Sequence, residues 1–227
     1  MSFLKFERFN FDSTHRRPLS WWSTMKTILI WHGLRTHALE QTGWNVTRRT
    51  KRALIHEKPT PWWTYASIQF VDQIVSTNSR ILEIGGGNSS LYWMERGNQL
   101  VTLETDLEWI DTLTLDQRFN LENHKIIHIA NEDLNSISKV LDNQLFDVVI
   151  NDGAGERAII GEYLTTKLKP NGIFIWDNSE REPDRQAIAN LELSGWNTLE
   201  FYGLGPINAY AWKTTILFRN DLRLSKI

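Results

Sequence analysis

The chain has 227 residues, with 41% hydrophobic and 23% charged residues and a net charge of −2. This length and composition fit one α/β domain with a full core and a small extension, and they exclude a mostly disordered chain. The absence of cysteine excludes disulfides, thiolate zinc sites and a cysteine nucleophile. The longest apolar-leaning stretch, residues 19 to 34, is interrupted by polar residues. We therefore expect no membrane span and a cytoplasmic protein.

The first 60 residues are basic and rich in tryptophan. They contain eleven Lys or Arg and only four Asp or Glu, so the remainder of the chain is acidic. Trp22, Met25 and Leu29 recur at helical spacing, which predicts a helical N-terminal extension over residues 1–60. Such an extension either holds an anionic partner or packs on its own acidic domain. The tryptophans, Trp31 among them, favour packing, so nucleic acid is not the partner we expect.

After residue 60 the hydrophobic pattern alternates between strand and helix periods, which predicts a second domain over residues 61–227. A helix over residues 62–75 leads into the first strand. The predicted strands cover residues 80–84, 99–104, 125–130, 147–151, 172–177, 197–203 and 213–219. The helices between them cover residues 90–97, 107–119, 135–141 and 156–168.

The order of these elements predicts the fold class. Strand followed by helix, repeated with short connections, implies a parallel sheet with right-handed crossovers. The loop between the last two strands, GLGPINAYA, is too short for a helical crossover and fits a hairpin instead. We therefore expect an α/β, Rossmann-like, doubly wound sheet of seven mostly parallel strands, with the last strand antiparallel.

A glycine loop, ILEIGGGNSS, follows the first predicted strand. Its N–H groups can approach a ligand closely because no Cβ intervenes. The spacing also approximates a dinucleotide-binding loop. Glu83, two residues before the first glycine, suits a ligand that carries an ammonium group better than a pyrophosphate. S-adenosylmethionine (SAM) has an ammonium, a sulfonium and no phosphate. Alternatively, Glu83 caps backbone amides at the strand end.

Polar side chains follow the later strands in an order that extends the same site. The carboxyl ends of parallel strands meet at one edge of the sheet, where open α/β sheets bind ligands. Glu104 is placed for two ribose hydroxyls, and Asp133 for the adenine amino group. The predicted cofactor-binding residues are Glu83, Gly85, Gly86, Gly87, Asn88, Ser89, Glu104, Asp133, Asn151 and Asp152.

With these motifs in place, residues 62 to 219 resemble the class I SAM-dependent methyltransferases. The motifs that carry the resemblance are EIGGGNS, the acid Glu104, FDVVINDG, LKPNGIFIWDN and the terminal hairpin. One departure is Ser89, which stands where the family usually has a third glycine. The resemblance implies SAM as cofactor and O-methylation of a small molecule or sugar. The subgroup that it suggests has no well-defined substrate.

Three residues are the candidate catalytic group: Asp152, Asp177 and Arg157. Together with Asn178, the two aspartates form an oxygen-only cluster that could bind Mg²⁺, similar to the metal site of catechol O-methyltransferases. Without a metal, Asp152 or Asp177 serves as the general base, with His124 and His128 as poorer candidates. Arg157 and Arg181 could clamp an anionic substrate or form ordinary ion pairs.

Several alternatives stay open. Trp62, Trp63 and Tyr65 either stack on a substrate ring or pack a covering helix. The basic extension leaves an RNA methyltransferase or a nucleic-acid-binding protein as the main alternative function. The IGGG loop also resembles aminopropyltransferases, and a nicotinamide dehydrogenase fits less well because it does not explain Glu83. The sequence leaves a homo-oligomer open.

Overall fold

A computed structural model of the chain describes residues 21–219, without the side chains of residues 21–24 and 38. Its contacts divide the chain into two compact units, Met1–Gln41 and Thr42–Ile227. Residues 42–60 of the expected extension therefore belong to the same unit as the sheet. Residues 1–20 of that extension, and the side chain of Trp22 that supported it, lie outside the described part.

The first unit is helical over its described residues, as predicted. Helix α1 (Trp21–Gly33) is followed by a π-helix, Leu34–Leu39. The side chain of Trp31 is 68% exposed, so the packing role expected for this residue is not found within the unit. Among the described residues, no helix is both long and apolar enough to cross a membrane.

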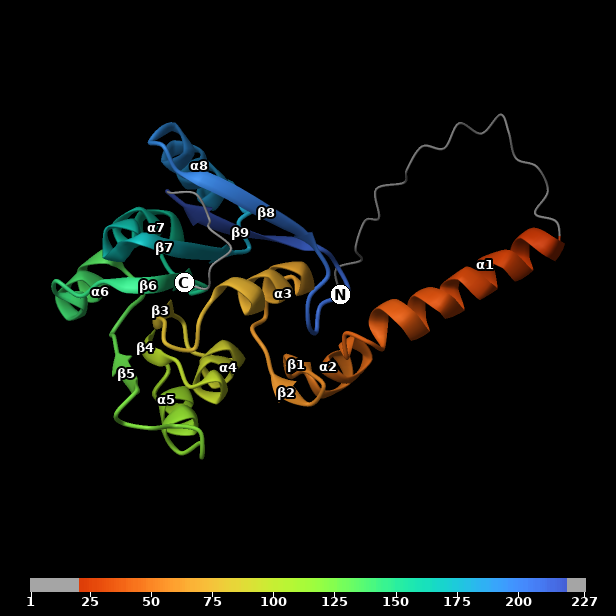
Figure 1. Cartoon of the computed structure of the whole chain (residues 1–227), viewed down its shortest axis with the longest axis horizontal. Coiled ribbons are helices and arrows are strands. Elements are labelled where there is room, and N and C mark those ends of the chain that lie inside the picture. Colours follow the sequence, from red (N-terminus) through yellow and green to blue (C-terminus); the bar gives the residue numbers. More distant parts are fainter. Residues whose placement is uncertain (1–20, 220–227) are drawn as a thin grey trace, which may run out of the picture. The chain divides into compact units, whose positions relative to one another are not determined.

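The second unit contains a seven-stranded sheet with strand order β5-β4-β3-β6-β7-β9-β8 (Figure 1). Strands β3 to β7 run parallel to one another, and β9 runs antiparallel to both of its neighbours. The predicted α/β sheet with an antiparallel last strand is thus confirmed. The strands are β3 (Arg80–Ile84), β4 (Gln99–Glu104), β5 (His124–His128), β6 (Phe146–Asn151), β7 (Leu168–Asp177), β8 (Asn197–Gly203) and β9 (Trp212–Phe218).

Helices cover both faces of this sheet, which explains why strands such as β6 are apolar at nearly every position. One hydrophobic cluster joins the sheet to α3 and α4, and a second joins it to α6, α7 and α8. The helices are α3 (Tyr65–Ile74), α4 (Asn88–Arg96), α5 (Leu107–Thr114), α6 (Leu134–Leu141), α7 (Arg157–Leu164) and α8 (Glu182–Leu193).

Helix α8 was not predicted, although local signals for it exist. Pro183 stands in its first turn beside Glu182 and Asp184, and both features favour a helix start. The predicted helix over residues 107–119 also ends earlier, because α5 stops at Thr114.

Residues 44–59 contain three elements that the sequence analysis did not resolve. Helix α2 (Trp44–Thr50) precedes a short hairpin formed by β1 (Leu54–Ile55) and β2 (Lys58–Pro59). The turn residues His56 and Glu57 have φ angles of +49° and +66°. Hairpins that need two such angles are usually signalled by Asn-Gly or Asp-Gly, so this sequence gave no warning of the turn.

Because α7 packs closely against the sheet, we predict that a larger side chain at Gly161 lowers the stability of the fold. A Cβ on Gly161 would lie 2.1 Å from Cη2 of Trp176, whose side chain is fully buried. Gly161→Ala should gain about 1 kcal/mol of helix propensity but lose about 1–3 kcal/mol through overpacking. We expect a net decrease in the free energy of unfolding, measured by urea denaturation.

Gly203→Ala is the matched control, because no atom lies within 4 Å of the Cβ that it would add. It should leave the free energy of unfolding within about 0.5 kcal/mol of the wild type. Equal stability of the two variants would contradict this account of the α7 packing.

Candidate functional site

The glycine loop after β3 packs against the loop after β6 at the carboxyl edge of the sheet. Gly85 has φ of +85°, and a Cβ there would lie 3.2 Å from Cα of Gly153. Its amide donates to the carbonyl of Leu103 on β4 at 2.9 Å. A side chain at Gly85 would be strained and would separate the two loops, so glycine is required for this close approach.

Glu104, at the end of β4, lies against the glycine loop. Its Oε2 accepts from the amide of Gly86 at 2.6 Å, and its Oε1 accepts from the amides of Thr105 at 2.7 Å and Asp106 at 2.9 Å. The residue is only 6% exposed. Three backbone donors therefore fix the direction of this carboxylate, and the structure brings it together with the loop as the sequence order implied.

Glu83 lies beneath the glycine loop and is fully buried. Its Oε2 accepts from the hydroxyls of Ser90 at 2.5 Å and Thr102 at 3.3 Å. Within the described residues, no donor meets hydrogen-bond geometry at its Oε1. Burial raises the pKa of Glu83 to about 8, against hydrogen bonds from Ser89, Ser90 and Thr102 and with a smaller contribution from Asp152. Glu83 thus interacts with hydroxyls, so the alternative that it caps backbone amides is wrong.

Ser89 occupies the place of the third glycine of the family loop. Its side chain is 4% exposed and lies near enough to Glu83 to oppose the rise in the pKa of that carboxyl. The neighbouring Asn88 donates from Nδ2 to the carbonyl of Ala53 at 3.0 Å. The departure from glycine therefore has a structural partner in this chain, the carboxyl group of Glu83.

Arg157 joins the ends of β6 and β7 from a position that is 6% exposed. Its guanidinium donates to the carbonyls of Gly153, Asn151 and Asp177, and its Nε lies 3.1 Å from Oδ2 of Asp184. The side-chain amide of Asn151 donates to the carbonyl of Arg157 at 2.9 Å. These acceptors occupy the guanidinium, so Arg157 positions the strand ends and is not available as the predicted substrate clamp.

Asp152 and Asp177 lie at adjacent strand ends, and each accepts an indole N–H. Trp63 donates to Oδ2 of Asp152 at 3.2 Å, and Trp212 donates to Oδ1 of Asp177 at 3.1 Å. Thr214 also donates to Oδ1 of Asp177, at 2.5 Å. Burial raises the pKa of Asp152 to about 6, and burial together with the charge of Asp152 raises the pKa of Asp177 well above its usual range. Asp177 is therefore the member of the pair that holds a proton more readily.

The predicted metal set does not fit Mg²⁺ in this arrangement. Asp152 and Asp177 each have an oxygen engaged by an indole, and Oδ1 of Asn178 accepts from the guanidinium of Arg181 at 2.9 Å. Mg²⁺ needs open oxygen ligands, and a neighbouring guanidinium repels it. Within residues 21–219, no cluster of three His, Cys, Asp or Glu side chains suits a metal ion either. No step of the chemistry proposed below uses a metal.

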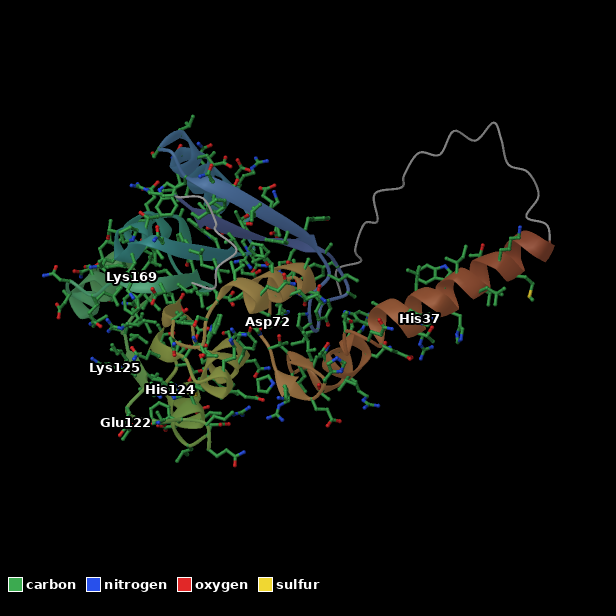
Figure 2. All side chains as sticks on the ribbon, viewed as in Figure 1. His37, Asp72, Glu122, His124, Lys125 and Lys169 are labelled. Carbon is green, nitrogen blue, oxygen red and sulfur yellow. The ribbon has the colours of Figure 1, made fainter. Side chains whose placement is uncertain are left out.

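The remaining predicted residues are distributed differently. Asp133 caps α6 by accepting from the amide of Ser136 at 2.7 Å, and this backbone hydrogen bond lowers the pKa of Asp133. The adjacent Glu132 accepts from the amide of Gly155 at 2.8 Å, which links the loops after β5 and β6. His124 lies at the start of β5, beside Glu122 and Lys125 (Figure 2). That is the amino edge of the sheet, so His124 cannot be the general base.

A cavity of about 250 Å³ opens beside the glycine loop. Trp62 lines it, whereas Trp63 and Tyr65 are buried in the core beneath α3. The sequence analysis did not identify Lys51, Trp109 or Ile207 as site residues. The walls are formed by Lys51, Ala53, Trp62, Gly85, Gly86, Gly87, Asn88, Ser89, Trp109, Asp152 and Ile207.

The fold is similar to those of several solved structures. An O-methyltransferase from Bacillus cereus in complex with SAH is 18% identical, with a TM-score of 0.55, and the match covers 85% of this chain and 97% of that one. The O-methyltransferase TomG from Streptomyces achromogenes, in complex with SAM, is 19% identical with a TM-score of 0.50, covering 63% and 74%. A methyltransferase from Pyrococcus furiosus is 15% identical with a TM-score of 0.50, covering 87% and 99%.

No protein-family model matches the sequence, and no curated protein matches it significantly. At these low identities the structural matches establish the fold of the second unit. The activity of the chain has to be argued from its own residues.

The buried carboxyl group of Glu83 makes a pH-dependent stability prediction. Its pKa in the folded chain, about 8, lies above its usual value of 4.5. Folding therefore favours the protonated form, and this stabilisation is fully present below pH 4.5 and is lost as the pH rises towards 8. Glu83→Gln should remove the loss, about 1 kcal/mol per pH unit, when the free energy of unfolding is measured from pH 5 to pH 8.

Glu122→Gln is the control, because Glu122 is exposed. It should follow the pH profile of the wild type. If Glu83→Gln also kept that profile, the raised pKa of Glu83 in the folded chain would be incorrect.

Proposed function

We propose that this chain is a SAM-dependent methyltransferase that methylates an oxygen atom of a small molecule, possible acceptors including sugars. The proposed cofactor-binding residues all lie within residues 61–227, and Lys51 and Ala53 from the expected basic extension over residues 1–60 line the cavity beside the glycine loop. The observation that carries the proposal is the carboxylate of Glu104, which is 6% exposed and held by the amide of Gly86. An oriented carboxylate beside a glycine loop suits the two ribose hydroxyls of a nucleoside.

The charges around the loop favour SAM over a phosphate-bearing cofactor. Burial raises the pKa of both Glu83 and Asp177, and the negative charge of Asp152 raises both further, so Asp152 lies close to each of them. Asp152, whose pKa of about 6 leaves it mainly ionised above pH 7, attracts an ammonium and a sulfonium and repels a pyrophosphate. SAM in TomG and SAH in the Bacillus cereus enzyme support the same choice. Asp133 and Asn151 remain proposed cofactor residues from the ends of β5 and β6, although Asp133 also caps α6 and the Asn151 amide also donates to the carbonyl of Arg157.

The chemistry requires a positioned acceptor and a base. Bound SAM supplies an electrophilic methyl group on sulfur. Asp152 lines the cavity, and its pKa of about 6 leaves it mainly ionised above pH 7. Asp152 could therefore accept the proton that the acceptor hydroxyl would lose when a methyl group passes to its oxygen and the carbon–sulfur bond of the cofactor breaks. The indole of Trp63 directs the Asp152 carboxylate, and the positive charges of Arg157 and Arg181 lower its pKa against the effect of burial.

The nucleic-acid alternative is not favoured by any contact within residues 21–219. Its main support is the basic segment over residues 1–60, of whose eleven Lys and Arg residues seven lie in the described part of the chain. Steep dependence of RNA binding on salt would revive it.

The first test is cofactor binding. Calorimetry should detect one equivalent of SAM per chain. Glu104→Ala should weaken that binding about 100-fold or more, because it removes charge-assisted hydrogen bonds to the ribose. Glu108→Ala, on the exposed side of α5, should leave the affinity unchanged. Unaltered affinity in Glu104→Ala would reject the proposed cofactor site.

The second test concerns the metal. Because Oδ2 of Asp152, Oδ1 of Asp177 and Oδ1 of Asn178 each accept from a protein donor, we expect methyl transfer to proceed within about twofold of its normal rate in excess EDTA. The measurement is SAH formation with and without chelator, followed by addition of Mg²⁺. Loss of transfer in EDTA with recovery in Mg²⁺ would show that the indoles do not replace a metal.

A further inference from the structure

Two segments far apart in the sequence form a cap beside the glycine loop. They are residues 42–64 and residues 204–211, and together they are called the cap here. The indole of Trp44 donates to the carbonyl of Asn208 at 2.7 Å, and the amide of Ile207 donates to Oγ1 of Thr47 at 3.0 Å. These hydrogen bonds fix one cap segment against the other.

The cap is also attached to the proposed active site. Asn88 of the glycine loop donates to the carbonyl of Ala53 at 3.0 Å, and Trp63 donates to Asp152 at 3.2 Å. The cap therefore supplies Lys51, Trp62 and Ile207 to the wall of the 250 Å³ cavity that the glycine loop also lines. Residues on this wall would face the methyl acceptor.

The cavity wall carries one positive and one negative side chain, Lys51 and Asp152. Lys51 is exposed, and within residues 21–219 its ammonium has no carboxylate at ion-pair distance. Asp152, in contrast, is held by the indole of Trp63. A ligand that filled this cavity would therefore meet an unpaired cation on the cap and a carboxylate at the sheet edge.

The rest of the cap wall is apolar. Trp62 is 45% exposed and presents a large ring surface, and Ile207 lies beside it in the lining. A flat or sugar ring gains stabilisation by covering an exposed indole. Both the ring surface and the cation come from the cap, so the cap determines which acceptor fits.

We infer that the acceptor is a small hydroxy compound that carries a ring and an anionic group. Lys51 binds the anionic group, Trp62 covers the ring and Asp152 faces the hydroxyl group. This inference rests on the proposed function. Lys51 and Trp62 are then specificity-determining residues. The anion is a carboxylate or a chemically similar group, and the ring is aromatic or a sugar.

The test measures binding of matched probes to the chain saturated with SAH. One pair is 4-hydroxybenzoate and phenol, and the other is glucuronate and glucose. In at least one pair, the acid should bind about tenfold more tightly than its neutral partner, the effect of one charge-assisted contact. Lys51→Met should abolish that preference and Lys51→Arg should retain it, while SAH affinity stays unchanged.

Arg52→Met is the control, because Arg52 is exposed next to Lys51 but does not line the cavity. It should keep the preference for the acid. The inference is overturned if neither acid is preferred or bound, if the preference survives in Lys51→Met, or if Lys51→Met instead weakens SAH binding, which would assign Lys51 to the cofactor carboxylate. Failure of the wild-type chain to bind SAM or SAH would instead reject the proposed function.

Discussion

The guanidinium of Arg157 holds the carboxyl ends of β6 and β7 together from inside the protein. It donates to the carbonyls of Asn151, Gly153 and Asp177, so one side chain sets the spacing of two strand ends. It also counters the burial that raises the pKa of Asp152 and Asp177. Without this cation, burial of two neighbouring carboxylates at this edge of the sheet would lower the stability of the folded state. The arrangement of the proposed base depends on it.

Neutral hydrogen-bond donors also interact with the acidic side chains at this edge of the sheet. Indoles, hydroxyls and backbone amides each point at a carboxyl oxygen of Glu83, Glu104, Asp152 or Asp177. Hydrogen-bond donors stabilise a carboxylate without adding a second ion to the cavity. Asp152 can therefore keep a negative charge towards the space that a cationic cofactor would occupy, and the cap can supply the opposite charge through Lys51.

The sequence predicted the sheet well because strand signals here are strong. Apolar runs such as FDVVI in β6, followed at once by Asn151 and Asp152, indicate both a buried parallel strand and its ligand-facing end. Helix α8 was missed although Pro183 and two acids signal its start. The hairpin of β1 and β2 gave no such signal, since His56 and Glu57 adopt positive φ angles without the Asn-Gly or Asp-Gly pair that usually marks such a turn.

The sequence by itself determined where the strands lie along the chain, the position of the glycine loop and the acids at the strand ends, because each of these depends on local periodicity and spacing. The tertiary structure decided what each side chain does there. Arg157 holds the strand ends together because their carbonyls accept hydrogen bonds from its guanidinium. Asp152 accepts a hydrogen bond from the indole of Trp63, which lies 89 positions away in the sequence. Lys51 lines the cavity, and the cap segment that contains it, residues 42–64, is hydrogen-bonded to the other cap segment, residues 204–211. Contacts of such long sequence separation leave no periodic trace, so only the folded chain reveals them.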